Sequence, residues 1–221
     1  MLGQTINLLE RDLWSGDLHP LAEQLGMPDG LAAPTALWPV DFSGAVRDLP
    51  SLRAFLTAYQ TRLLAPVELP TIVRAYGHAS RFEVRELIEL DRRLASDPGL
   101  RNFAVASQHV GRRQLKRLRP LRDQRLVQRY LQAVENGEAH AWHTVVYGLV
   151  LALYSLPLRQ GLAGYAQQTL RGFIYAAGAS LGLKAGQGEE LLAWCGRDLS
   201  PAIEAAVATG FGNQSRLPSP S

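Results

Sequence analysis

The spacing of the apolar residues is the feature that most limits what this 221-residue chain can fold into. Over much of the sequence, apolar side chains recur every three or four residues, which is the period of an amphipathic helix. The pattern is clear at Leu52, Phe55, Leu56, Tyr59 and Leu63, and again at Val84, Leu87, Leu90 and Leu94. No segment shows the regular alternation of a strand, so we predict an all-α fold.

Prolines, glycines and capping residues mark where the helices should begin and end. DLPS opens the first helix and APVELP closes it, while NG at 136–137 is a typical C-terminal pair. Ser200 is expected to cap the last helix. The sequence predicts helices over about 52–63, a short stretch after Pro70, 84–94, 98–118, 121–134, 138–155, 158–183, 189–196 and 201–210.

The two most apolar helices, 138–155 and 158–183, are expected to form a central hairpin in a single-domain helical bundle. The expected organisation is an N-terminal segment packed on the bundle over 1–45, the all-α domain over 46–210 and a flexible tail over 211–221. The apolar runs fall short of the roughly 20 residues that span a bilayer. The N-terminus also lacks the apolar core of a signal peptide. We therefore expect a soluble, cytosolic protein without a membrane partner.

Basic residues cluster in GRRQLKRLRPLRDQRLVQR, residues 111–129, although the formal net charge of the chain is only +3. Three interpretations stay open: a solvated helix surface, a docking site for an acidic protein, or a nucleic-acid-binding module. Little aromatic interleaving and no known binding motif weigh against nucleic acid. The cluster consists of Arg112, Arg113, Lys116, Arg117, Arg119, Arg122, Arg125 and Arg129.

Catalytic and cofactor-binding patterns are weak. The glycine-rich stretch GLKAGQGEE, residues 182–190, lacks the lysine–hydroxyl pair of a phosphate-binding loop and fits a turn between helices. Cys195, the single cysteine, lies among apolar residues, where a buried and unreactive thiol is usual. Glu86 and Glu89 fit surface ion pairs on an arginine-rich helix better than an acid–base pair. We predict a protein that is not an enzyme and holds no cofactor.

His140 and His143 are the one pair with possible metal-ligand spacing. On a helix starting near Glu138 they would share a face and offer two nitrogen ligands. A stable metal site needs three or four ligands, and no third partner is evident. Tyr147 and Tyr154 continue the same stripe into the apolar segment. We therefore interpret the pair as the polar start of a core helix and predict no metal site.

Several segments together resemble the UreF family of urease accessory proteins. They follow the family order over roughly 45–217: RELIELDRRLAS at 85–96, LRNFAVASQHVGRRQL at 100–115, the segment from HTVVYG to GASLGL at 143–183, GQGEELL at 186–192 and QSRLPSPS at 214–221. Residues 1–45 do not show the opening that this family usually has. The GQ turn and the tail are also altered, with Pro218 where the family has phenylalanine.

The resemblance implies a non-catalytic, cytosolic homodimer that bridges UreD, also called UreH, and the GTPase UreG. That assembly delivers nickel to apo-urease, and UreF would modulate the GTPase. Expected partner-binding residues are Arg112 and Arg113 of the basic cluster, Gly186 and Gln187 of the turn, and Ser215, Arg216 and Leu217 of the tail. Expected structural core residues are Ser107, Gly111, His143, Tyr147 and Gly148.

Overall fold

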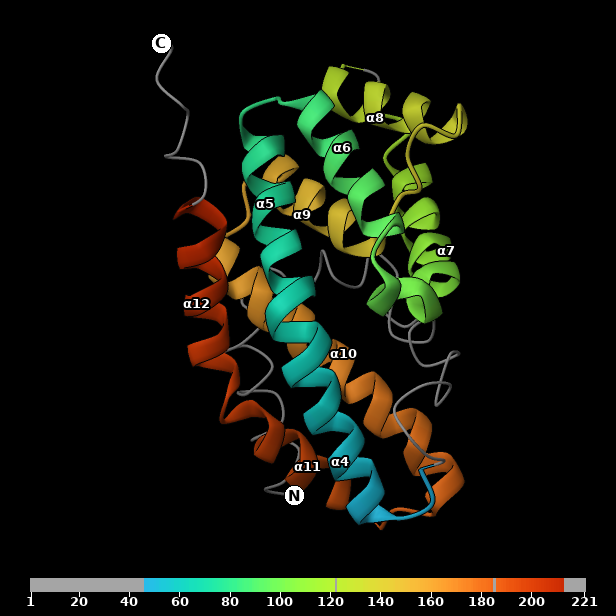
Figure 1. The fold of residues 1–221 in the computed structure, drawn as a ribbon, viewed down its shortest axis with the longest axis vertical. Coiled ribbons are helices and arrows are strands. Elements are labelled where there is room, and N and C mark those ends of the chain that lie inside the picture. Colours follow the sequence, from blue (N-terminus) through green and yellow to red (C-terminus); the bar gives the residue numbers. More distant parts are fainter. Residues whose placement is uncertain (1–45, 122, 185, 213–221) are drawn as a thin grey trace.

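Helices make up most of the chain that the computed structural model describes, which is residues 46–121, 123–184 and 186–212 (Figure 1). No residue in these ranges belongs to a strand, and the all-α prediction is confirmed. The α-helices are α4 (Leu49–Tyr59), α5 (Leu69–Ser80), α6 (Val84–Ala95), α7 (Arg101–Arg117), α8 (Arg125–Glu135), α9 (His143–Leu153), α10 (Leu158–Leu181), α11 (Gln187–Gly196) and α12 (Leu199–Gly212). A π-helix, η1 (Gln60–Glu68), and a 3₁₀ turn, η2 (Pro98–Leu100), complete them.

The first three helical elements follow one another without a break, as one long diagonal rod in Figure 1. Asp48 and Ser51 cap its start reciprocally: the Ser51 amide donates to the Asp48 carboxylate over 2.9 Å, and the Asp48 amide donates to the Ser51 hydroxyl over 3.0 Å. The predicted break at APVELP is wrong. Pro66 lies inside the π-helix, whose wider turn tolerates an interrupted hydrogen-bond ladder, and Pro70 follows directly after that turn, at the junction with α5.

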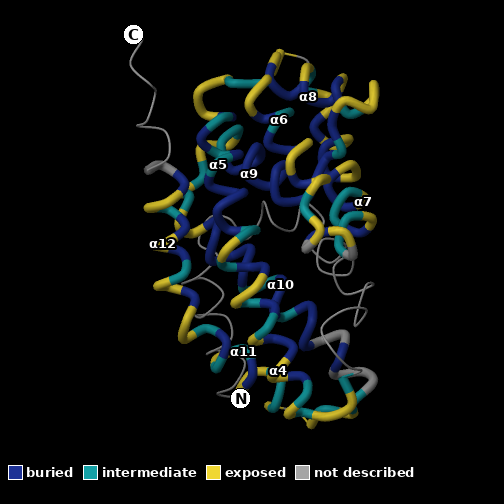
Figure 2. Tube along the Cα trace, in the orientation of Figure 1, coloured by how far each residue is buried: buried dark blue, intermediate teal, exposed yellow. Residues whose placement is uncertain are grey.

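The core is centred on α9. Every residue from His143 to Leu151 is buried, as expected of a helix that is covered on all sides. Helix α5 makes the most extensive contact with α9, and α7 packs against another side of it. Figure 2 shows this burial concentrated where α5, α6 and α9 meet. The apolar composition of residues 143–153 therefore predicts their central position.

Helices α9 and α10 follow each other along the chain but do not pack along each other as the expected central hairpin, because they have different main neighbours. Helix α10 runs beside α4 and α5 and is covered by α11 and α12. The ring of Phe173 on α10 meets Phe55 and Tyr59 of α4 edge-on, with centroids 5.1 and 4.8 Å apart. Helix α9 touches α10 where the Tyr147 hydroxyl donates to the carbonyl of Gly161 over 3.0 Å. Within the described ranges, no helix combines the length and apolar character needed to cross a bilayer.

Candidate functional site

The two histidines do not share a helix. Helix α9 begins at His143, with Trp142 as its N-cap, and Ala141 has a positive φ of 58°. His140 therefore lies in the segment before the helix, and the prediction of a helix from Glu138 with both imidazoles on one face is wrong. The reason is a contact with a distant residue: the amide of His140 donates to Asp91 instead of entering a helix.

Asp91 on α6 organises this segment from inside the protein. Its carboxylate is fully buried and accepts three hydrogen bonds, from the His140 amide over 2.5 Å, the Trp142 amide over 2.9 Å and the Tyr130 hydroxyl over 2.6 Å. A buried carboxylate is tolerated when its lone pairs are satisfied in this way. Burial and the adjacent carboxylate raise the pKa of Tyr130 well above its usual value, so its proton stays on the hydroxyl. Asp91 thus joins α6, α8 and the start of α9.

His143 lies in a buried aromatic and amide environment. Its Nε2 is 3.3 Å from Nε2 of Gln114, and its amide donates to the Ser107 hydroxyl over 3.1 Å, both on α7. The rings of Tyr147 and Tyr165 flank the imidazole at centroid distances of 6.0 and 5.5 Å. Burial lowers the pKa of His143 to about 4, so the ring is neutral at physiological pH.

Metal ligation by these groups finds no support in the described part of the chain. No group of three or more His, Cys, Asp or Glu side chains lies together there in a way that could hold a metal ion. The donors around His143 are an amide, a hydroxyl and two phenols, which are poor ligands for a transition metal. The arrangement instead fixes the first turn of α9 against α7.

Two glycines allow the close packing of α9. A Cβ atom on Gly111 would lie 1.9 Å from the carbonyl oxygen of Ala141, so α7 reaches the backbone before α9 only because this side chain is absent. A Cβ atom on Gly148 would lie 2.6 Å from the carbonyl oxygen of Ile72 on α5. Ser107, Gly111, His143, Tyr147 and Gly148, expected as core residues, thus meet at the contacts of α9 with α7, α5 and α10.

Sequence reasoning missed a second buried polar group at the end of the π-helix. The Glu68 residue is half-buried, but its carboxyl group lies inside the protein, where the Tyr59 hydroxyl donates to it over 2.5 Å. Burial raises the pKa of Glu68 to about 7, and hydrogen bonds from Tyr59 and Tyr165 partly oppose this shift. A signal was present in the sequence, because Glu68 lies between apolar residues of APVELP, the stretch predicted to close the first helix.

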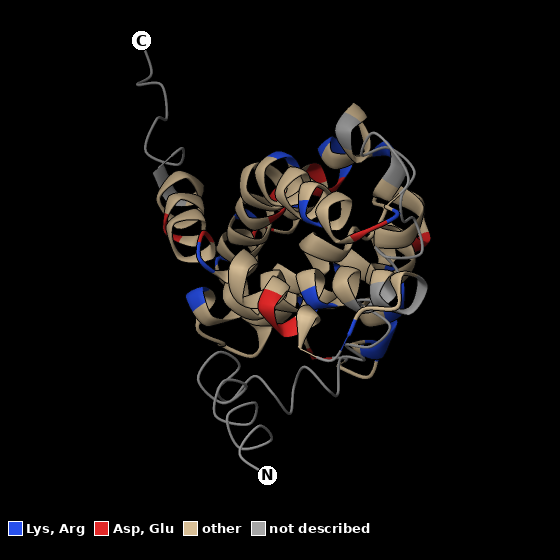
Figure 3. Ribbon diagram, turned by 90° about the horizontal axis from the view of Figure 1, so that it is seen from below, with Lys and Arg blue, Asp and Glu red and all other residues tan. Residues whose placement is uncertain are grey.

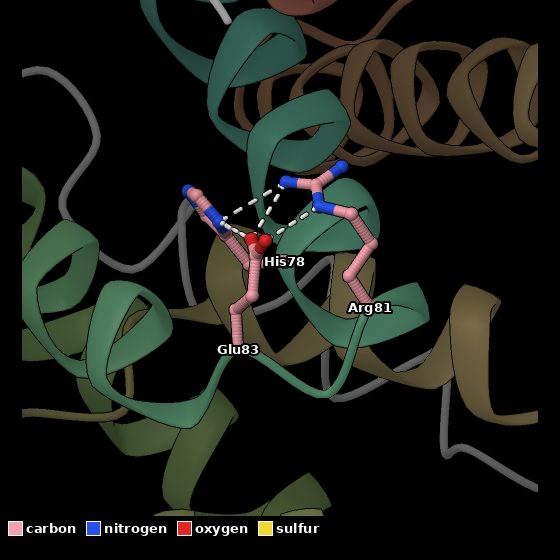
Figure 4. A network of polar contacts seen from close by, with 3 residues as sticks. All are labelled: His78, Arg81 and Glu83. Carbon is pink, nitrogen blue, oxygen red and sulfur yellow. Dashed lines mark hydrogen bonds and ion pairs between the residues drawn. The ribbon is translucent and has the colours of Figure 1, made fainter. Parts of the chain in front are cut away.

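The α5–α6 corner holds a more exposed polar network (Figure 4). Arg81 donates to both carboxylate oxygens of Glu83, each over 2.7 Å, and Nδ1 of His78 lies 2.7 Å from the same carboxylate. The hydrogen bonds from Arg81 and then His78 lower the pKa of Glu83 to about 2. Phe82, between Arg81 and Glu83 in the sequence, adopts a positive φ of 58°, and 73% of its surface is exposed. The network holds a tight turn in a conformation that a bulky residue seldom adopts.

The basic cluster lies over the C-terminal half of α7, the 118–124 connection and the start of α8. Arg112 and Arg113 are both exposed on α7. Arg119 is paired with Glu135 at the end of α8, and the Gln128 side chain donates to the backbone carbonyls of Arg119 and Leu121 over 3.3 and 3.0 Å. These contacts hold α8 against the connection. Arg122 lies outside the described residues.

The remaining predicted site residues lie elsewhere. Gly186 has a φ of 94° and precedes α11, which begins at Gln187. The Gln187 side chain accepts a hydrogen bond from the Lys184 amide over 2.8 Å.

Cys195 is buried on α11, and burial raises the pKa of its thiol to about 12. Glu89 pairs with Arg92 and Arg93 on the surface of α6. Residues 1–45 and the tail residues Ser215, Arg216 and Leu217 lie outside the described residues.

Comparison with models of known protein families places the chain in a family. A protein-family model described as UreF matches residues 46–195, which is more than half of the chain and extends from the residues before α4 through Cys195 of α11. No curated protein matches the chain. The matched range contains Asp91, Gly111, His143 and Gly148, around which the core is organised.

Proposed function

The chain belongs to the UreF family of urease accessory proteins, and we propose from this premise that it is a non-catalytic scaffold for urease maturation. In this role it joins UreD and UreG in one assembly, promotes nickel insertion into apo-urease and modulates the GTPase of UreG. The observation that carries the proposal is the family match across α4 to α11, which includes the whole α5–α7–α9 core.

We further propose that the protein acts as a cytosolic homodimer and meets its partners through surface residues. The hydrogen bonds that Asp91, Ser107 and Gln114 make at the start of α9 support a structural role for this region. Gly186 is exposed and Gln187 is half-buried at the beginning of α11, next to the connection from α10, where a partner could reach them. We assign these residues and Ser215, Arg216 and Leu217 of the tail to UreD binding.

Co-purification tests the scaffold directly. The full chain is expressed with UreD, with UreG and with both, and the complexes are separated by size-exclusion chromatography with light scattering, which also reports the dimer. We expect a complex with UreD and a larger one with both partners. Folded partners that associate with the chain in none of these combinations would contradict the proposal. The GTP hydrolysis rate of UreG with and without the complex tests the regulatory part.

The tail makes the first prediction. If Arg216 anchors it through a charge-assisted hydrogen bond, Arg216→Ala should cost on the order of 1.5–3 kcal/mol of binding free energy, or roughly a ten- to hundredfold rise in the Kd for UreD. Arg197→Ala, which removes an exposed arginine at the end of α11, is the matched control and should leave the Kd unchanged. Calorimetry with purified UreD measures both, and equal Kd values for the two variants would show that the tail is dispensable.

A further inference from the structure

Charge is strongly segregated along this chain. Residues 98–134 contain nine lysines and arginines and a single acidic residue, Asp123, so this segment has a formal charge of +8. The whole chain carries +3, and the remaining residues therefore sum to −5. The segment comprises η2, α7, the 118–124 connection and nearly all of α8. The distribution of basic and acidic residues over the ribbon can be followed in Figure 3.

Four of these basic residues form what we call the basic surface: Arg112, Lys116, Arg125 and Arg129. All four are exposed, and none makes an ion pair with any described residue. Arg112 and Lys116 are one turn apart on α7, and Arg125 and Arg129 are one turn apart on α8. Helices α7 and α8 contact each other, and Gln128 fastens α8 to the connection between them.

The opposite side of α7 is fixed in the core. Ala106, Val110 and Leu115 are buried, and Gly111 lies against the backbone before α9. The basic side chains are therefore presented from a rigid helix, and binding would not require the backbone to become ordered first. Such preorganisation reduces the entropic cost of association.

Helix electrostatics explains only part of the cluster. Lys116 and Arg117 lie in the last turn of α7, where cations interact favourably with the helix dipole. Arg125, however, is the first residue of α8, whose first turn holds no acidic residue and whose N-cap makes no side-chain hydrogen bond. A cation at a helix N-terminus is unfavourable for the isolated helix. Stability of the fold therefore does not account for Arg125.

The exposed residues of α7 also indicate which class of anionic partner, protein or nucleic acid, the surface would bind. Val105 stands on the same line as Arg112 and Lys116, at helical spacing, and leaves 78% of its surface exposed. An exposed apolar residue suits a protein surface better than a phosphate backbone. Nucleic-acid surfaces commonly add aromatic rings for stacking, but in residues 98–134 Phe103 is half-buried and Tyr130 is buried.

We propose that the basic surface docks the acidic surface of a protein partner, with Val105 making the apolar contact beside it. The proposal rests on the proposed function, in that the partner belongs to the urease maturation assembly. Charge complementarity of this kind steers association and selects the partner, and it weakens as salt rises. The surface lies on α7 and α8, whereas Gly186, which we assign to UreD binding, lies directly before α11.

Two quadruple variants of the full chain test the proposal. One replaces the basic surface (Arg112→Gln, Lys116→Gln, Arg125→Gln, Arg129→Gln). The matched control removes the same charge from exposed residues elsewhere (Arg47→Gln, Arg62→Gln, Arg85→Gln, Arg197→Gln). Glutamine preserves helix propensity, and circular dichroism checks that both variants fold. The probes are fluorescent poly-L-glutamate and double-stranded DNA of similar length, each titrated at low salt and at about 0.15 M salt.

We expect the wild type to bind poly-L-glutamate in preference to DNA, with affinity that falls as salt rises. The basic-surface variant should lose about tenfold or more in affinity for poly-L-glutamate, because four exposed ion pairs each contribute a small part. The control variant should lose much less. An equal loss in both variants, no binding of the wild type to either probe, or preferential binding of DNA would overturn the proposal, and the last would assign the surface to nucleic acid.

A second arm uses UreD, UreG and apo-urease as the ligands. We expect the basic-surface variant to weaken capture of at least one of them with the same salt dependence, while the control variant does not. If the wild type captures none of the three, the proposed function fails, and the poly-L-glutamate titration still decides whether the surface recognises acidic protein. If the wild type captures its partners and both variants do so equally, the docking surface is wrong while the scaffold role stands.

Discussion

At the scale of single residues, buried polar groups decide how the apolar core is arranged. Asp91 satisfies two backbone amides and one hydroxyl from elements 39 to 51 residues further along the chain. Such contacts cannot be read from local sequence, because the pattern of RELIELDRRLAS gives Asp91 the appearance of one more charged residue beside Arg92 and Arg93. Sequence could predict that α6 is a helix, and it could not predict that its aspartate faces inward.

Removing the Asp91 carboxylate should be strongly destabilising. Asp91→Ala leaves the amides of His140 and Trp142 and the Tyr130 hydroxyl without their acceptor inside the protein. Each unsatisfied buried group costs about 1–3 kcal/mol, so we expect a loss of at least about 3 kcal/mol in the free energy of unfolding. Tyr130→Phe removes only one of the three bonds and should cost about 1 kcal/mol. Urea denaturation measures both, and equal losses would show that the two amide contacts contribute nothing.

Two buried groups, Glu68 and His143, should make the free energy of unfolding depend on pH in opposite directions. The pKa of Glu68 rises from 4.5 to about 7 on folding. The contribution of Glu68 to the free energy of unfolding is therefore complete below pH 4.5 and is lost as the pH rises through 7. The pKa of His143 falls from 6.5 to about 4, so its contribution is complete above pH 6.5 and is lost as the pH falls through 4. Between pH 4.5 and 6.5 the two effects oppose each other.

Glu68→Gln should separate these contributions. The variant cannot ionise at this position, so its stability relative to the wild type should increase between pH 5 and pH 8, by on the order of 3 kcal/mol for the full pKa shift. Urea denaturation of both proteins at the two pH values gives the difference. Glu190→Gln, which changes an exposed carboxylate on α11, is the control and should show no such change. A Glu68→Gln difference that is independent of pH would contradict burial of the ionised group.

At the scale of elements, the sequence predicts the helices better than their ends. Helices α6, α7, α8 and α10 follow the apolar spacing, and their predicted ranges differ from the structure by a few residues. The two larger errors have physical causes. Prolines were expected to end a helix at 65–70, whereas burial of Leu63, Leu64 and Leu69 keeps the rod helical through a π turn. The start of α9 was placed too early because Asp91, distant in sequence, holds the preceding residues.

Contact between α7 and α9 should depend on the missing side chain of Gly111. Alanine normally stabilises a helix relative to glycine, by about 0.5–1 kcal/mol. At Gly111 its Cβ would meet the Ala141 carbonyl at 1.9 Å, so the backbone must move and we expect a net loss of about 2 kcal/mol or more. Gly164→Ala on α10, where the nearest atom is 3.8 Å away, should instead be neutral or stabilising. Thermal and urea denaturation compare the two, and equal effects would contradict the close approach.

At the scale of the whole molecule, fold class and family follow from the sequence while the surfaces of interaction do not. Helical periodicity and the apolar segment at 143–153 predict an all-α fold with that segment buried at its centre. The resemblance to UreF is confirmed by the family match over residues 46–195. Which arginines are unpaired depends instead on tertiary contacts: Arg119 and Arg125 look alike in the sequence, but only Arg119 meets a carboxylate, that of Glu135.

The Asp91 contacts also set an order of events during folding. They join residues 49 and 51 positions apart, so a long loop must close before the segment preceding α9 is fixed, whereas α6, α7 and α8 each form from near neighbours. We expect this loop to close after the rate-limiting step of folding. Asp91→Ala should then accelerate unfolding and leave the refolding rate nearly unchanged, and stopped-flow measurements in urea distinguish this from a slower refolding. The centre of the protein would thus be the last part to be secured.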